Sequence, residues 1–169
     1  MTYKETQKFK QIWIWLLLIA VAATTIGIVG YGCYQQLYLG IQFGDNPTGD
    51  AALLFTFILI VFFNAAIIAM FAFAKLTTMI DEQGIHYRFF PFHFKMRTIA
   101  WNQIDHYEVI QYKPLIDYGG WGIRYGRGKK AYNVSGNKGL QIYMKTGKNL
   151  LIGTQQEKEL EEFLRTMGR

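Results

Sequence analysis

Two long runs of uncharged, mostly apolar residues occupy much of the first half of the chain. The first run is Ile12–Tyr34 and the second is Ala51–Ala74, and neither contains Asp, Glu, Lys or Arg. At about 1.5 Å of rise per residue, each run forms a helix long enough to cross a hydrocarbon core of about 30 Å. Trp13 and Trp15 stand at the start of the first run, and such aromatic rings are enriched at membrane interfaces. The pattern predicts two transmembrane helices, 12–34 and 51–74.

The polar segments around these helices predict their orientation. Residues 1–11 carry three lysines and one glutamate and are expected to form a short exposed cytoplasmic leader, whereas residues 35–50 contain two aspartates and no Lys or Arg. Because Lys and Arg are enriched in cytoplasmic segments, Lys10 and Lys75 place both ends of the helical pair inside and the loop 35–50 outside. Both termini of this integral membrane protein are therefore expected in the cytoplasm.

A second interpretation of the N-terminus stays open. A basic leader, an apolar core and the small-residue run Ala20–Ala23 are also typical of a cleavable signal peptide. We favour an uncleaved helix, since the apolar run continues well beyond these residues. The second helix crosses from outside to inside in either case.

From Leu76 onward the hydrophobic pattern changes its period. Ile85–Phe89 alternates apolar and polar residues like a half-buried strand, and turn-forming residues separate about seven such segments. Thr154 and Glu157 fit a capping box ahead of a final helix. The apolar residues of that helix recur at helical spacing: Leu160, Phe163, Leu164 and Met167. The sequence predicts an α+β membrane protein in which residues 76–169 form a bent antiparallel sheet with a C-terminal amphipathic helix.

Charge is concentrated in this second half. Of the 30 charged residues, 24 lie in 75–169, and 76–169 contains 14 Lys or Arg against 9 Asp or Glu, a balance of +5. Next to a membrane, this excess serves solubility or attracts anionic lipid head groups. The excess is modest and no nucleic-acid-binding motif accompanies it, so no nucleic-acid partner is expected.

The residues that usually carry chemistry are sparse. Cys33 is the single cysteine, so an intrachain disulfide is excluded, and the three histidines lack the spacing of metal ligands. Ser135 is the single serine, and it lies in a turn without the G-x-S-x-G pattern of a hydrolase nucleophile. The sequence therefore predicts a protein that is not an enzyme and that uses neither a metal nor a cofactor.

One basic cluster is the candidate binding site. It consists of Arg124, Arg127, Lys129 and Lys130. On an anchored domain these residues are expected to contact lipid or a partner, with each basic residue near an anionic surface contributing about 1 kcal/mol. Arg124 has a structural alternative, because it can pair inside the sheet.

Two residues in the helices are candidates for helix–helix contact. Gly27 follows Ala23 by four residues, and small residues at this spacing let helices approach closely, either within the hairpin or in a dimer. Asn64 lies in mid-span, where its amide needs a partner such as Thr24, Thr25, a backbone carbonyl or a second chain.

Several short segments resemble a known family. They are Ile80–Ile85, Ile99–Trp101, Tyr118–Arg124, Tyr132–Gly136, Lys138–Leu140 and Leu151–Thr154. Together with the order of elements, they resemble membrane-anchored bacterial proteins with a pleckstrin-homology-like (PH-like) domain. The resemblance covers 76–169 and, more loosely, the preceding hairpin. It implies a PH-like fold anchored in the inner membrane, and no activity. Phosphoinositide binding, known from eukaryotic members, is not transferred, because Arg88, Lys95 and Arg97 are the only basic residues between the first strands.

The sequence thus predicts a non-enzymatic, membrane-anchored interaction module. Its domain is expected to bind a partner protein, its own copies or anionic lipid head groups at the cytoplasmic face. The alternative is a scaffold subunit of a membrane complex that assembles through the transmembrane helices.

Overall fold

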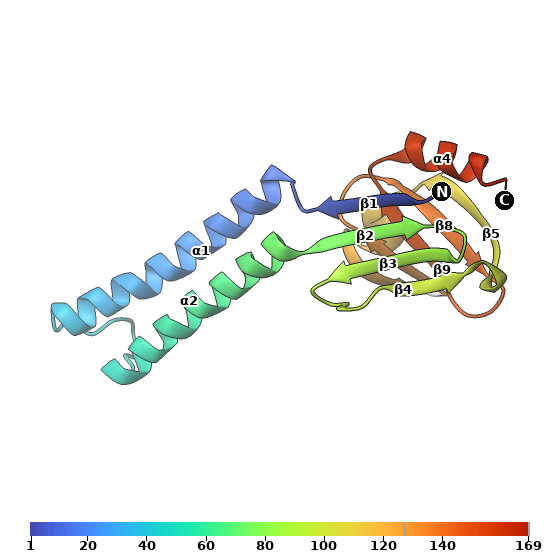
Figure 1. The fold of residues 1–169 in the computed structure, drawn as a ribbon. Coiled ribbons are helices and arrows are strands. Elements are labelled where there is room, and N and C mark those ends of the chain that lie inside the picture. Colours follow the sequence, from blue (N-terminus) through green and yellow to red (C-terminus); the bar gives the residue numbers. More distant parts are fainter. Residues whose placement is uncertain (127, 169) are drawn as a thin grey trace. The chain divides into compact units, whose positions relative to one another are not determined.

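The computed structural model describes residues 1–126 and 128–168, and the chain divides into two units. Residues Lys10–Ala72 form a helical hairpin. Met1–Phe9 and the chain from Phe73 onward fold together into a second unit, here called the sheet unit. The hairpin is therefore inserted into the sequence of the sheet unit, between its first two strands (Figure 1).

The hairpin consists of the two apolar helices that the sequence predicts. Helix α1 spans Ile12–Cys33 and continues into the π-helical turn η1, Tyr34–Tyr38. Helix α2 spans Asp50–Phe73. Both are long and apolar enough to cross a membrane.

The first sheet has the order β1-β2-β3-β4, and every neighbouring pair is antiparallel. Its strands are β1 (Tyr3–Lys8), β2 (Lys75–Ile80), β3 (Gly84–Phe90) and β4 (Arg97–Ala100). The short 3-10 helix η2, Trp101–Gln103, leads from this sheet into the second one.

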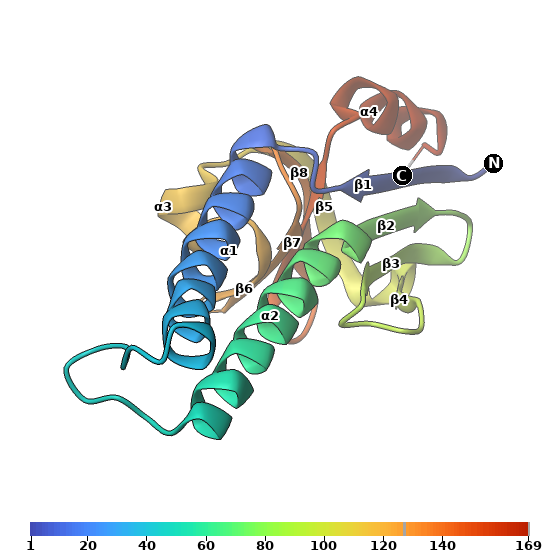
Figure 2. The same ribbon diagram turned by 90° about the vertical axis from the view of Figure 1, so that its left-hand side faces the viewer.

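The second sheet has the order β5-β8-β9-β7-β6. Its strands are β5 (Ile104–Gln111), β6 (Gly122–Gly126), β7 (Lys129–Asn133), β8 (Lys138–Met144) and β9 (Asn149–Thr154). Helix α3, Pro114–Tyr118, connects β5 to β6, and helix α4, Glu157–Thr166, follows β9 (Figure 1 and Figure 2).

The α+β class is confirmed, but the predicted sheet is wrong in two respects. From Lys75 onward the described residues form eight strands, close to the predicted seven, but the strands lie in two sheets instead of one, and β7 pairs with β9 in parallel. Alternation along a strand indicates which face is buried, and it carries little information about the direction of the neighbouring strand. The predicted amphipathic helix is confirmed, since Leu160 and Leu164 of α4 are buried.

The prediction of an exposed leader at residues 1–11 is also wrong. Tyr3–Lys8 forms β1, which pairs with β2 over its full length and buries every second side chain. Two of these inward side chains are Glu5 and Gln7, and Gln7 Nε2 donates to the carbonyl oxygen of Gly153 at 2.6 Å. The folded domain thus includes Met1–Phe9 in addition to the predicted 76–169.

The carboxylate of Glu5 fastens β1 to the end of β9. Its Oε2 accepts hydrogen bonds from the hydroxyls of Tyr3 at 2.8 Å and Thr154 at 2.7 Å. Its Oε1 accepts from the backbone N–H of Gln155 at 2.7 Å. This arrangement corrects the predicted capping box, because the Thr154 hydroxyl donates to Glu5 and α4 begins only at Glu157.

Removal of the N-terminus would take a strand out of the fold. The register pairs Lys8 with Lys75, so the chain leaves the sheet for the hairpin and returns to it at adjacent positions. Signal-peptide cleavage near Ala20–Ala23 would remove β1 together with its buried Glu5. The described fold requires the uncleaved N-terminal segment.

We predict that Glu5→Ala destabilises the sheet unit by about 2–4 kcal/mol, because it leaves two buried hydroxyls and one partly buried backbone N–H without their acceptor. The measurement is thermal or denaturant unfolding of the full chain in detergent, followed by tryptophan fluorescence. Thr6→Ala on the exposed side of the same strand is the control, with little expected change. Equal stability of Glu5→Ala and the unaltered chain would contradict the structural role of Glu5.

Candidate functional site

The chain leaves the sheet unit and re-enters it at the same end of that unit. Lys75 pairs with Lys8 on one side and with Phe90 on the other, so the end of β1, the start of β2 and the end of β3 lie side by side (Figure 1). The β3–β4 loop, residues 91–96, begins directly after Phe90. Phe9, the last residue before the hairpin unit, packs edge-on against Phe89 with ring centroids 6.5 Å apart. We call this region the hairpin end.

An aromatic–basic cluster lies next to the hairpin end. It consists of Tyr87, His93, Arg97, Lys130 and Tyr132. The Tyr132 ring centroid is 4.9 Å from that of Tyr87 and 5.2 Å from that of His93. The Lys130 ammonium lies 4.9 Å from the centroid of Tyr132, within cation–π distance. Strands of both sheets and the β3–β4 loop therefore contribute to one cluster.

Phe89 links this cluster to the exit of the hairpin. Its ring centroid is 6.4 Å from Tyr132, and its other neighbour is Phe9. A second ring also flanks the Lys130 ammonium, since the centroid of Tyr125 is 4.8 Å away. The Lys130 side chain is therefore held by aromatic contacts close to the point where the chain enters the hairpin.

The cluster combines buried polar groups with positive charge. The Tyr132 side chain is fully buried, and Tyr87 and Arg97 are polar neighbours of its hydroxyl. Burial raises the pKa of Tyr132, and the nearby guanidinium of Arg97 acts in the opposite direction. Burial lowers the pKa of His93, and the positive charges of Arg97 and Lys130 lower it further.

The ion pairs of the described residues do not involve the basic side chains of the cluster. Those ion pairs join His86 to Asp81, His106 to Asp105 and Lys138 to Glu157. Arg97 and Lys129 are exposed to solvent, and Lys130 is half-buried. An arrangement of this kind can bind an anion by charge-assisted hydrogen bonds.

The four basic residues predicted from the sequence have different environments. Lys129 and Lys130 begin β7. Arg124 lies on β6, and its Nε donates to the carbonyl oxygen of Trp121 at 2.9 Å, which supports the structural alternative for this residue. Arg127 lies outside the described residues, and its predicted role stays a prediction.

Sequence reasoning missed Tyr87, His93 and Arg97 as part of this site. They come from β3, the β3–β4 loop and β4, more than 30 residues before Lys130. The sequence contains one indication that this segment can bind an anion, because residues 83–104 contain three basic residues and no Asp or Glu. Only the fold shows that this acid-free segment meets β7.

The two residues predicted to make helix–helix contacts, Asn64 and Gly27, also differ in their surroundings. Asn64 Nδ2 donates to Thr25 Oγ1 at 3.2 Å and to the Ile60 carbonyl at 2.9 Å, so the prediction that Thr25 or a backbone carbonyl satisfies this amide is confirmed. A Cβ added to Gly27 would meet no atom within 4 Å, whereas one on Gly30 would lie 3.3 Å from the Phe57 ring. The close approach within the hairpin falls at Gly30, and a contact of Gly27 with a second chain stays a prediction.

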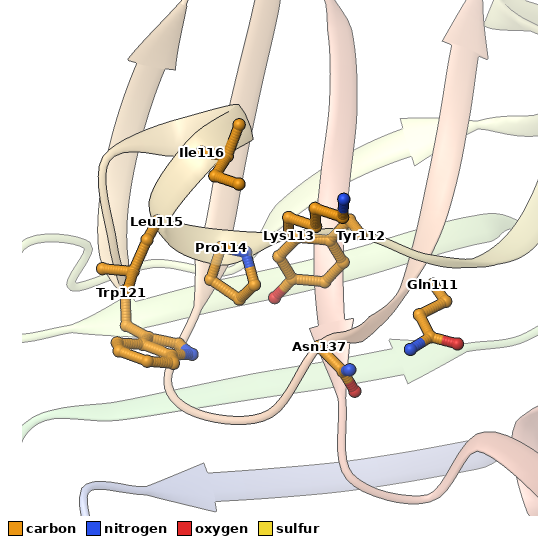
Figure 3. Close-up of a pocket in the computed structure, with 8 residues that line it drawn as sticks. All are labelled: Gln111, Tyr112, Lys113, Pro114, Leu115, Ile116, Trp121 and Asn137. Carbon is orange, nitrogen blue, oxygen red and sulfur yellow. The ribbon is translucent and has the colours of Figure 1, made fainter.

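A separate open cavity of about 680 Å³ lies beside α3 (Figure 3). It is lined by Gln111, Tyr112, Lys113, Pro114, Leu115, Ile116, Trp121 and Asn137. Lys113 is the charged residue of this lining, and Leu115 and Ile116 are exposed. Trp121 is fixed by a hydrogen bond from its Nε1 to the Gly136 carbonyl at 2.9 Å. The lining offers apolar surface, two amides and one ammonium group.

Comparison with known proteins gives no assignment, since no protein-family model matches the chain and no curated protein matches it significantly. Among the described residues, no group of three or more His, Cys, Asp or Glu is placed to hold a metal ion. The fold and the aromatic–basic cluster are therefore the observations from which we infer function.

We predict that the sheet unit loses stability as the pH falls below about 6.5 because of His93. Its pKa in the folded chain lies below the ordinary value of 6.5, so the unfolded chain takes up the proton first as the pH falls. The stabilisation from neutral His93 is fully present above pH 6.5, and it is lost as the pH falls toward and through the pKa of His93 in the folded chain. The measurement is the melting temperature of the full chain in detergent at several pH values.

Two histidine variants test the assignment to His93. His93→Gln should flatten the decrease, whereas His106→Gln, at an exposed position, should preserve it. An unchanged decrease in His93→Gln would show that another group is responsible.

Proposed function

We propose that this chain is a non-enzymatic, membrane-anchored module of the PH-like type, whose sheet unit binds anionic lipid head groups at the cytoplasmic face of the inner membrane. The observation that carries the proposal is the position of the aromatic–basic cluster. It lies beside the end of the sheet unit from which the chain enters the apolar hairpin.

The anchor is supported by the helices and by the pairing of β1 with β2. Because the two strands pair across the hairpin, the N-terminus and the rest of the sheet unit must lie on the same side of a membrane that the hairpin crosses. Lys8, Lys10 and Lys75 flank the apolar helices on this side. Their positive charge favours the cytoplasmic side.

The PH-like character is supported by the order of elements. A four-stranded antiparallel sheet is followed by a second sheet and by the C-terminal amphipathic helix α4. This agrees with the resemblance in sequence over 76–169. The parallel pair β7–β9 departs from the antiparallel pattern that the resemblance led us to expect.

Head-group binding is supported by the chemistry of the cluster. Arg97 and Lys130 supply positive charge, and a lipid phosphate supplies the missing negative partner. A head group suits this position better than a soluble protein, because the cluster adjoins the hairpin end.

The scaffold alternative receives less support. The Asn64 amide is bonded within the hairpin, to Thr25 and to the backbone of its own helix. It therefore does not require a second chain to satisfy it.

We predict that Arg97→Glu with Lys130→Glu weakens binding of phosphatidylglycerol about tenfold or more, since each basic residue near an anionic surface contributes about 1 kcal/mol. The measurement is native mass spectrometry of the full chain in detergent with phosphatidylglycerol or phosphatidylcholine added. Binding of phosphatidylcholine should change little.

The matched control carries the same change in charge on α4, with Lys158→Glu and Arg165→Glu at exposed positions. It should keep the preference for phosphatidylglycerol. If both double variants lose that preference equally, net charge explains the binding, and the proposed site is wrong.

A further inference from the structure

We infer that the β3–β4 loop is a second membrane contact, in which Phe92 and Phe94 insert into the interfacial region of the same bilayer that holds the hairpin. The inference rests on the proposed membrane anchoring and adds to it a specific apolar contact. The occupant of this surface is the phospholipid interface itself.

The loop exposes large apolar side chains on a short segment. The exposed fractions are 57% for Phe92, 76% for Phe94 and 37% for Met96. His93, between the two phenylalanines, is buried and packs edge-on against Tyr87 with ring centroids 6.2 Å apart. The buried ring of His93 thus attaches the loop to the sheet, while Phe92 and Phe94 face solvent. Contiguous exposed apolar residues on a folded domain mark a contact surface.

The register of the first sheet places this loop next to the point of membrane entry. Phe90, the last residue of β3, pairs with Lys75, the first residue of β2, and Lys75 in turn pairs with Lys8 (Figure 1). Adjacent strands lie about 4.8 Å apart, so the loop begins about one strand spacing from the residue at which the chain returns from α2.

The rings at the base of the loop keep it at the hairpin end. Phe94 packs edge-on against Phe90 with centroids 6.0 Å apart, and Phe92 lies 6.1 Å from Phe89. The Lys75 ammonium is 5.8 Å from the centroid of Phe90. The exposed phenylalanines are therefore supported by the same residues that receive the chain from α2.

The charges around the loop fit a phospholipid surface. Lys95 and Arg97 alternate with Phe94 and Met96 along the chain, and residues 83–104 contain no Asp or Glu. Apolar side chains that enter the acyl boundary while basic residues meet anionic head groups are the usual means of interfacial binding. A second copy would bring the same basic loop against itself in a two-fold contact, which like charges disfavour.

The test uses the full chain in vesicles that contain phosphatidylcholine and phosphatidylglycerol. In a Cys33→Ala background, Phe94→Cys is labelled with the environment-sensitive fluorophore NBD. The matched control is Glu82→Cys, at an exposed position in the β2–β3 turn, at the opposite end of the same sheet. Resistance of each labelled chain to carbonate extraction is measured in parallel.

The inference predicts that the label at position 94 emits at shorter wavelength than the label at 82, and that lipids with a nitroxide on the upper acyl chain quench it. Water-like emission at 94 in a chain that resists extraction would overturn the inference and leave the proposed anchoring intact. A shifted emission that these lipids do not quench would mean that protein covers the loop, which also overturns it. Extraction of the chain by carbonate would overturn both proposals.

Discussion

Backbone pairing between β1 and β2 is the constraint on which the rest of the structure depends. Six residue pairs, from Tyr3 with Ile80 to Lys8 with Lys75, join the segment before the hairpin to the segment after it. The buried carboxylate of Glu5 adds a link from β1 to the end of β9. A buried carboxylate is tolerated only when donors satisfy it, and here three donors do so. The sheet unit thereby joins the segments that precede and follow the inserted helices in the sequence.

This pairing explains why apolar and basic residues meet at the hairpin end. The pairing brings the exit and entry of the chain together, the β3–β4 loop follows beside them, and the ring of Phe89 connects them to Tyr132 and Lys130. Attraction between exposed charges acts over a Debye length of about 8–10 Å, whereas apolar contact acts only when surfaces touch. A surface that has both kinds of residue suits a bilayer interface, which offers charge outside and hydrocarbon within.

The parts of the fold that local patterns encode could be predicted from the sequence. Helices α1 and α2 follow from apolar runs, and α4 follows from helical spacing of Leu160 and Leu164. Strand β1 could not be recognised, because its inward positions include Glu5 and Gln7, whose partners lie about 150 residues away. The same limit applies to the site: Lys129 and Lys130 are visible as a basic run, but the proximity of Lys130 and Arg97 to His93 is a property of the tertiary fold.

The separation between Glu5 and Thr154 also sets the order of events during biosynthesis. Strand β1 is synthesised well before the last of its partners, because 149 positions separate the two hydrogen-bonded residues. At rates of 5–20 residues per second, β1 waits for roughly 7–30 s. During that interval both apolar helices are made. Until β1 is in place, the edge of β2 that pairs with it stays open, and an open strand edge can pair with other chains.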